Sequence, residues 1–444
     1  MSPLQNGFRE GRSTTHHILA LCHLLDIAKS RRKYPIHGCF VDFSKAFDSI
    51  SWPAIRRALI SWNTPIALIN AVFAVMQGHT MRVRVDDQLS EPIPVGVGVL
   101  QGDTLAPFLF VLVVDGLLQS LPRDCGLPID AATLVAMAYA DDIVLLAPTI
   151  EKLQTLFTTL EANALKVGLK INLGVGKTER FKVDETDPHP ETPLLTGKGE
   201  TITMTTSYKY LGVYAMDREE DWKKRKGKCW AALKGLESIW KSNASMETKR
   251  GLFYALVEPI LTYGLCAWSS PRYFEKQIDA QFGRMLRYAL GLKAAFISRN
   301  QCHTEDLYAG KPFLSTLLRS RRMALIAHCY REHYETHVRF HPFIHVLFWE
   351  PCLNKYPRYP GGQRLTLQKS IFRDARVETV EHLAQLMLNR TKSRKLVEDV
   401  KHESQRQCWK EIHRRRERQL ENMTLADLAQ HHDWLRHIDT THEH

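Results

Sequence analysis

Two adjacent carboxylates inside an apolar run constrain the fold of this chain more than any other feature. Residues 134–147 read LVAMAYADDIVLLA, so Asp141 and Asp142 interrupt a stretch that would otherwise make two core strands. The pattern predicts a hairpin that turns at the acidic pair. Burying carboxylates without a partner destabilises the folded state, and a hairpin with a purely structural role would avoid this cost. Another group must therefore compensate their charge.

Composition indicates a globular protein with a basic second half. The chain has 444 residues, 44% of them hydrophobic, which is enough for two or three domains with real cores. The formal net charge is +12, yet residues 1–180 contain 17 Lys and Arg against 16 Asp and Glu. Nearly all of the excess therefore lies in the remainder, and it favours a polyanionic partner.

Cysteine usage and hydropathy exclude several classes of protein. Nine cysteines without any CxxC pair predict reduced thiols in an intracellular protein and argue against zinc ligation. The first residues, MSPLQNGFRE, lack the apolar core of a signal peptide, and no stretch of eighteen apolar residues occurs. No membrane partner is expected.

Strand and helix patterns divide the chain into a mixed sheet domain, a surface loop and a helical part. Between Gly38 and Tyr214, short apolar strands alternate with longer helical patterns, as in an α/β or α+β sheet domain. Residues 184–200, rich in Pro, Thr, Glu and Gly, predict a surface loop. From Asp217 onward the pattern is helical and basic.

A third carboxylate supplies the context for the acidic pair. In HGCFVDFSKAFDSI, residues 37–50, an apolar strand ends at Asp42 and a helix follows. If that strand lies beside the predicted hairpin, Asp42, Asp141 and Asp142 converge and raise one another's pKa unless hard cations neutralise them. Two Mg²⁺ ions about 3.5–4 Å apart are the usual solution for in-line displacement at phosphorus. The acidic pair alone could also be an ordinary polar turn.

Six motifs in a fixed order resemble those of reverse transcriptases. They are QNGFREGRSTTHHI, CFVDFSKAFDSI, GVLQGDTLAPFLFVLVVD, AYADDIVLLA, GLKINLGVGKTE and YKYLGVY, and they span residues 5–214. QNGFREGRSTT and AFDSI are similar in style to non-LTR, LINE-like retrotransposons, and PILTYGLCAWS, residues 259–269, extends the likeness toward residue 330. The resemblance implies an α+β fold, with a right-hand polymerase palm built on an antiparallel sheet with packed helices. The palm would occupy residues 37–215, after partial fingers in 1–36. A helical thumb or connector would follow in 216–330, and a helical region without an assigned role in 331–444.

The resemblance also implies an activity. An RNA-directed DNA polymerase would bind an RNA template and a primer–template duplex and transfer a dNTP to the primer 3′-hydroxyl, in the nucleus. Asp42, Asp141 and Asp142 would be both catalytic residues and the ligands of two Mg²⁺ ions, with Mn²⁺ as a substitute. The alternative is a catalytically inactive, nucleic-acid-binding remnant of a retroelement polymerase. The intact carboxylates and Phe47 favour the enzyme, whereas the expected lack of upstream fingers strands favours the remnant.

Three further residues would shape the nucleotide pocket. Phe47 stands where the family places an aromatic ring that blocks a ribose 2′-hydroxyl, although a core phenylalanine is the simpler interpretation. Gln101 and Gly102 would open a helix where the missing side chain lets backbone or base approach closely. An ordinary glycine at a helix start is the alternative.

Lys177 resembles the lysine that protonates the departing pyrophosphate. The family places it three residues after an asparagine, whereas LGVG separates Asn172 from Lys177 here, so the longer loop could move the lysine. GVGKT also suggests a phosphate-binding P-loop, but Ile171 stands where that motif needs glycine.

Family members carry further fingers strands and a triphosphate-holding arginine before QNGFR. The sequence therefore predicts a chain that lacks these strands and any endonuclease domain, with Arg9 and Arg12 as the remaining fingers cations that bind the nucleotide. Its His and Cys residues do not have zinc-knuckle spacing. KKRKGK, residues 223–228, is either a phosphate-contacting helix face or an ordinary solvated one.

Overall fold

A four-stranded antiparallel sheet lies at the centre of the first half of the chain. The computed structural model describes residues 1–30, 35–129, 132–183, 192–268, 271–292, 307–335, 342–349 and 366–403. The strand order is β10 (Glu179–Val183), β1 (Ile36–Val41), β9 (Asp142–Ala147) and β8 (Ala136–Tyr139). All six residues of β1 are buried, as expected for a central strand of apolar residues. The predicted hairpin, and the neighbouring strand that ends before Asp42, are therefore confirmed.

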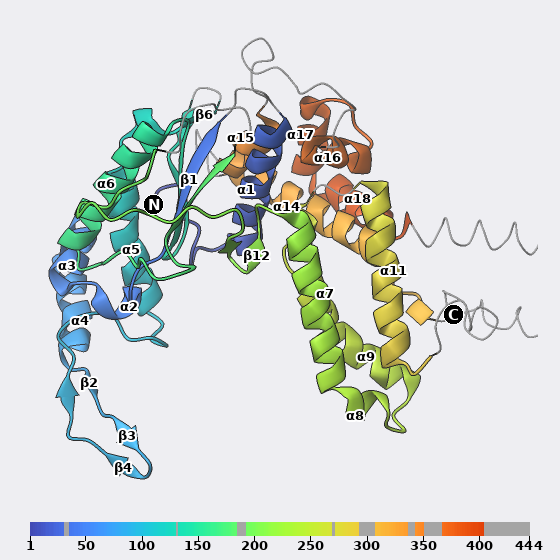
Figure 1. Cartoon of the computed structure of the whole chain (residues 1–444), viewed down its shortest axis with the longest axis horizontal. Coiled ribbons are helices and arrows are strands. Elements are labelled where there is room, and N and C mark those ends of the chain that lie inside the picture. The colour runs from blue at the N-terminus through green and yellow to red at the C-terminus, as the bar shows by residue number, and fades with distance from the viewer. Residues whose placement is uncertain are drawn as a thin grey trace, which may run out of the picture.

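Helices cover both faces of this sheet (Figure 1). Helix α6 (Ile150–Lys166) contacts β9 and β1 and also packs on α5 (Ala106–Gln119), whereas α1 (Thr14–Ser30) contacts β8 and β10. The buried residues of α6 recur every three or four positions, which gives the helix one apolar face for the sheet: Leu153, Leu156, Phe157, Leu160 and Ala164.

Short elements complete the first half of the chain. The helices are α2 (Ala46–Ser49), α3 (Trp52–Ser61), α4 (Ile66–Gln77) and the 3-10 helix η1 (Arg123–Cys125). The paired strands are β2 (Thr80–Met81) with β5 (Ile93–Pro94), β3 (Arg84–Val85) with β4 (Gln88–Leu89), β6 (Leu127–Ile129) with β7 (Ala132–Leu134), and β11 (Lys209–Tyr210) with β12 (Val213–Tyr214). Strands β2 to β5 form an arm that projects from the body in Figure 1.

The rest of the chain is helical wherever the structure describes it. Its elements are α7 (Arg218–Gly235), α8 (Glu237–Trp240), α9 (Met246–Leu256), α10 (Glu258–Thr262), η2 (Leu265–Ala267), α11 (Arg272–Ala289), α14 (Leu314–Glu335), α15 (Pro342–Phe348), α16 (Leu367–Ala375), α17 (Val380–Leu388) and α18 (Arg390–Lys401). The prediction of helices after Asp217 is confirmed for the described residues. Residues 404–444 and the first part of the predicted surface loop, 184–191, lie outside them.

The ribbon forms an arch (Figure 1). Helices α1 and α14 lie near its crown, the β2–β5 arm forms the foot of one leg, and α8 and α9 form the foot of the other. No helix among the described residues has both the length and the apolar character needed to cross a membrane. Within the same residues, the cysteines at positions 22, 39, 125, 229, 266 and 329 are free and buried.

Candidate active site

The register of the sheet brings three carboxylates to one end of it. Val41 pairs with Ile143, so Asp42 leaves β1 beside the first residue of β9, which is Asp142. Asp141 lies in the turn between β8 and β9, because Tyr139 pairs with Asp142. Asp42 and the acidic pair are about a hundred positions apart in the chain, yet they lie at the same end of the sheet, as the sequence predicted.

Crowding and burial act on the acidic pair. Desolvation is the main cause that raises the pKa of Asp141, and the nearby Asp42 carboxylate raises it further. The pKa of Asp142 rises to about 6, first through desolvation and then through the negative charges of Asp141 and Asp42. The ammonium group of Lys177 opposes both shifts. A bound cation would favour the ionised forms far more strongly than one lysine does.

Lys177 reaches the carboxylates in spite of its longer loop. Its Nζ lies 3.5 Å from Asp42 Oδ1, while Asn172 Nδ2 donates to Asp42 Oδ2 over 2.9 Å. Backbone hydrogen bonds inside the loop, including one from Lys177 N to Gly174 O, fold the two extra residues into a local turn. Tyr208 Oη donates to Lys177 O over 2.7 Å, so the segment before β11 also holds this lysine.

A strained residue precedes the acidic pair. Ala140 has a φ of +56°, a conformation that costs an L-residue roughly 1–2 kcal/mol and that hairpin turns usually give to glycine. Gln5 hydrogen-bonds both ends of this residue: Ala140 N donates to Gln5 Oε1, and Gln5 Nε2 donates to Ala140 O. Sequence reasoning missed Gln5, whose only signal was its place in the QNGFREGRSTT motif.

Phe47 lies in α2 and is half-buried. One face of its ring stacks on Phe110 of α5, with ring centroids 4.5 Å apart and planes inclined by 13°. The edge contact of Phe47 with Phe8 spans 6.4 Å, and Phe8 is 58% exposed. The structure thus places beside Phe47 a second accessible ring, which the sequence did not single out.

The Gln101–Gly102 pair does not open a helix. Helix α5 begins at Ala106, with Pro107 in its first turn, so the prediction of a helix start at Gln101 is wrong. Gly102 has a φ of +95°, which requires a turn and favours glycine. Both residues are exposed, and apart from the two chain neighbours of Gly102, no atom of the described residues lies within 4 Å of a Cβ added to it. The space for a close approach therefore exists, but on a loop.

Arg9 and Arg12 have structural contacts in the fold. Arg9 donates to the backbone carbonyls of Ser2 and Gln5. Arg12 Nε lies 2.6 Å from Glu332 Oε1 of α14, and the Arg12 side chain is only 3% exposed. Because a paired and buried guanidinium would have to give up that partner to hold a triphosphate, this placement does not favour Arg12 as a nucleotide ligand. Triphosphate binding by Arg9 stays a prediction.

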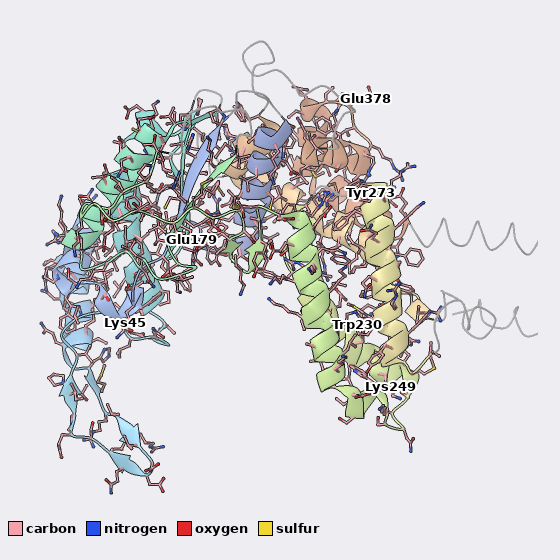
Figure 2. The ribbon with its side chains drawn as sticks, viewed as in Figure 1. Lys45, Glu179, Trp230, Lys249, Tyr273 and Glu378 are labelled. Atoms are coloured by element: carbon pink, nitrogen blue, oxygen red, sulfur yellow. The ribbon has the colours of Figure 1, made fainter. Side chains whose placement is uncertain are left out.

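A basic groove runs between α7 and α11. Its volume is about 1100 Å³. Six cations line it together with three aromatic residues and two glutamates: Arg218, Lys223, Lys224, Lys226, Lys228 and Arg284 with Trp222, Tyr273 and Phe274 and with Glu219 and Glu220. In Figure 2, Tyr273 marks the start of α11 and Trp230 a lower point on α7. The cations of the predicted α7 face therefore line a groove whose other side is formed by α11.

One cation of the KKRKGK segment does not belong to this surface. Arg225 is 5% exposed, its Nε lies 2.6 Å from Asp221 Oδ2, and it also donates to Tyr263 O. The bond to Tyr263 O joins α7 to the residue that follows α10, and because of the buried pair with Asp221, Arg225 is not available to phosphate.

The raised pKa of Asp142 predicts a stability change. In the folded state this carboxyl releases its proton near pH 6, whereas in the unfolded chain it does so near its ordinary value. The ionised carboxylate therefore opposes folding above about pH 6, and this cost vanishes as the pH falls below the unfolded pKa. In EDTA, Asp142→Asn should raise the melting temperature at pH 7.5, and the gain should shrink toward pH 4.5. A gain that is absent or independent of pH would contradict the raised pKa.

Comparisons with known proteins show what the sequence of this chain is similar to. A family model described as "Reverse transcriptase (RNA-dependent DNA polymerase)" matches residues 1–215. The chain is 31% identical over 204 residues to a retrovirus-related Pol polyprotein from the type-1 retrotransposable element R2 of Nasonia vitripennis, covering 43% of this chain and 19% of that protein. It is 26% identical over 276 residues to a probable RNA-directed DNA polymerase from transposon BS of Drosophila melanogaster, covering 60% of this chain and 30% of that protein.

A solved telomerase of Candida tropicalis, in complex with a fragment of telomeric RNA, gives a TM-score of 0.36 at 12% identity, covering 89% of this chain and 53% of that one, a likeness too slight to support an argument.

The chain spans less than a third of the length of either retroelement relative. The matched residues include all three converging carboxylates and the loop of Lys177. Residues 1–215 of this chain are therefore similar to reverse transcriptases, including those of non-LTR retrotransposons.

Proposed function

We propose that this chain is an RNA-directed DNA polymerase that extends a primer 3′-hydroxyl by two-metal nucleotidyl transfer. The observation that carries the proposal is the convergence of Asp42, Asp141 and Asp142 at one end of the sheet, beside the ammonium group of Lys177. We assign fingers to residues 1–36, palm to 37–215 and thumb to 216–330. The relationship to retroelements supports a nuclear location.

The carboxylates fit divalent metal ions by their chemistry. Aspartate oxygens are the hard donors that Mg²⁺ prefers, and a cation beside Asp142 would offset the desolvation and the neighbouring negative charges that raise the pKa of this carboxyl. Among the described residues, no three His, Cys, Asp or Glu side chains are arranged to hold one metal ion as they stand. The three carboxylates would therefore have to rotate toward a bound ion. Two Mg²⁺ ions, or Mn²⁺ in their place, would activate the primer hydroxyl and neutralise the departing pyrophosphate.

Lys177 supports the departure of pyrophosphate. Its side chain is half-exposed and ends 3.5 Å from Asp42 Oδ1, so its Nζ can move from that carboxylate to a nearby phosphate oxygen. A protonated amine at that point would stabilise the developing charge and donate a proton to the leaving group.

Phe47 and the Gln101–Gly102 turn would bound the nucleotide. The Phe47 ring is fixed by its stack on Phe110, so it offers a rigid surface against the sugar. A ribose 2′-hydroxyl pressed against that surface would be desolvated without a hydrogen-bond partner, which disfavours ribonucleotides. The open space over Gly102 would admit the nucleotide or the template base.

The groove between α7 and α11 would hold the nucleic-acid backbone. Its cations outnumber its carboxylates, and three aromatic residues line it as well, a combination that suits phosphate and exposed bases together. Lys226 lies 5.6 Å over the Trp222 ring and Arg218 lies 5.2 Å over the Phe274 ring, so these cations are held in place by the aromatic residues.

Neutralising the groove should weaken binding in a salt-dependent way. Replacing Lys223, Lys228 and Arg284 by glutamine should reduce primer–template affinity and lower the slope of log affinity against log salt by about two to three, since each phosphate contact contributes roughly 0.9 for a duplex. Filter binding at several salt concentrations measures the slope.

A matched control removes the same charge elsewhere. Lys152, Lys166 and Lys198 are exposed on or beside α6, and their replacement by glutamine should leave the slope unchanged. Equal slopes for the two triple variants would show that the α7 face is merely solvated.

Template-directed addition of one nucleotide tests the proposed activity. With a primer annealed to RNA and with Mg²⁺ or Mn²⁺ present, the chain should add only the dNTP that is complementary to the next template base. Binding of primer–template without any addition would instead identify an inactive remnant.

A further inference from the structure

The first residues of the chain lie along the outer edge of the catalytic hairpin. Asn6 N donates to Ala138 O and Ala138 N donates to Leu4 O, each over 2.9 Å, and Gln5 forms a parallel bridge with Ala138. Strand β8 is the edge strand of the sheet, so this segment extends the sheet by one short parallel strand. It ends directly behind the turn that carries the acidic pair.

Gln5 is buried, and both polar atoms of its side-chain amide bond the residue that begins this turn. Its side chain is 0% exposed. Gln5 Oε1 accepts from Ala140 N and from Gly7 N, each over 2.8 Å, and Gln5 Nε2 donates to Ala140 O over 3.2 Å. One amide thus bonds both polar backbone groups of the residue with the left-handed φ.

Gly7 fits the same turn by its shape. A Cβ added to Gly7 would lie 2.3 Å from Ala140 N, closer than any real contact. The backbone of the N-terminal segment therefore approaches the turn as closely as a glycine allows. Two independent features therefore fit the N-terminal segment to Ala140: the Gln5 amide bonds its backbone, and Gly7 lacks a side chain that would clash with it.

We propose that Gln5 is a positioning residue of the active site, whose amide holds the peptide groups of Ala140 in the left-handed conformation and so aims the Asp141 and Asp142 carboxylates. Without these hydrogen bonds, Ala140 would relax toward negative φ, as L-residues do, and the Asp141 peptide would rotate with it. A shift of about 1 Å at a reacting group can cost a hundredfold in rate. The catalytic part of this inference rests on the proposed function.

A purely structural role for Gln5 makes a different prediction. If Gln5 only stabilised the fold, its loss would lower the melting temperature, and no change at Ala140 would repair it. If Gln5 holds the turn, a glycine at position 140 should reduce the need for it, because glycine adopts positive φ without strain. The interaction between the two positions is therefore the decisive quantity.

The experiment compares the parent with Gln5→Met, Ala140→Gly and the double variant. Methionine keeps the length of the side chain and removes its hydrogen bonds. The control is Ser2→Ala, because Ser2 lies in the same buried segment and its hydroxyl accepts from Leu4 N rather than from the turn. Each protein is measured for kcat of single-nucleotide addition, for Mn²⁺ affinity by electron paramagnetic resonance, for primer–template Kd and for melting temperature. The Asp141→Asn protein identifies which part of the Mn²⁺ signal comes from the site.

Gln5→Met should lower kcat roughly tenfold to a hundredfold. It should also weaken the Mn²⁺ binding that Asp141→Asn removes. The primer–template Kd should change by less than about twofold, since phosphate contacts elsewhere supply that affinity. Adding Ala140→Gly should recover a large part of both losses, and Ser2→Ala should show neither.

Two results would overturn the inference. If Gln5→Met kept the parental kcat and Mn²⁺ affinity, the turn would keep its conformation without the Gln5 amide. Losses that Ala140→Gly leaves unrepaired, including a lower melting temperature, would make Gln5 structural. If Gln5→Met does not fold, Gln5→Asn, whose shorter amide cannot reach Ala140, takes its place under the same criteria. If the parent adds no nucleotide, the proposed function fails, while the Mn²⁺ measurements still decide the role of Gln5.

Discussion

Asp42→Asn and Asp141→Asn should each reduce primer extension by roughly a thousandfold or more, because bound metal ions contribute several kcal/mol of transition-state stabilisation. Asparagine keeps the size of the side chain and removes the charge that the metal ions require. Primer–template binding should stay nearly unchanged, since lysine and arginine contacts to phosphate supply most of it. Rates of single-nucleotide addition and filter binding measure the two effects separately.

Asp48→Asn is the matched control for this pair. Asp48 belongs to the same CFVDFSKAFDSI motif, but its side chain is exposed in α2. We expect a much milder loss from its replacement. If either Asp42→Asn or Asp141→Asn retained activity within about tenfold of the parent, the assignment of these carboxylates to the metal ions would be wrong.

Phe47→Ala should admit ribonucleotides. Removing the ring opens the space that a 2′-hydroxyl would occupy, and discrimination by shape in an apolar pocket is typically worth about tenfold to two-hundredfold. We therefore expect the ratio of dNTP to rNTP efficiency to fall by roughly tenfold to a hundredfold. Steady-state incorporation opposite a single template base, measured with each nucleotide in turn, gives this ratio.

Phe47→Tyr is the control because it retains the ring that stacks on Phe110. It should keep the parental preference for dNTPs. An unchanged ratio in Phe47→Ala, together with a lower melting temperature, would make Phe47 an ordinary core residue that only supports α5.

The β8–β9 hairpin and the strand ending at Asp42 could be predicted because their signal is local. Strand β1 and the strands on either side of the acidic pair are apolar, so charged residues at their ends are conspicuous in a window of about a dozen positions. The helices after residue 217 were predictable for a similar reason, since their apolar and basic residues recur at helical spacing. The start of α5 was misplaced because Gln101 and Gly102 come shortly before a long apolar run, and only the backbone shows that three non-helical residues, 103 to 105, intervene.

Contacts between distant residues could not be predicted in the same way. Gln5 and Ala140 are 135 positions apart, and nothing in the periodicity of either segment indicates that an amide and a strained turn will meet. Arg12 and Arg225 had the appearance of free cations in basic motifs, whereas Glu332 and Asp221 neutralise them in the fold. Lys177 shows the reverse case, because its unusual spacing cast doubt on a contact that the folded loop does make.

RNA-templated synthesis by the unaltered chain is the direct test of whether this protein is an RNA-directed DNA polymerase. A labelled DNA primer annealed to a defined RNA is incubated with the protein, Mg²⁺ and all four dNTPs, alongside the Asp141→Asn protein. We expect a product that extends the primer, resists alkali and has the sequence complementary to the RNA, and we expect none from Asp141→Asn. Primer–template binding by a correctly folded parent that yields no such product, with Mg²⁺ or Mn²⁺, would contradict the proposed polymerase activity.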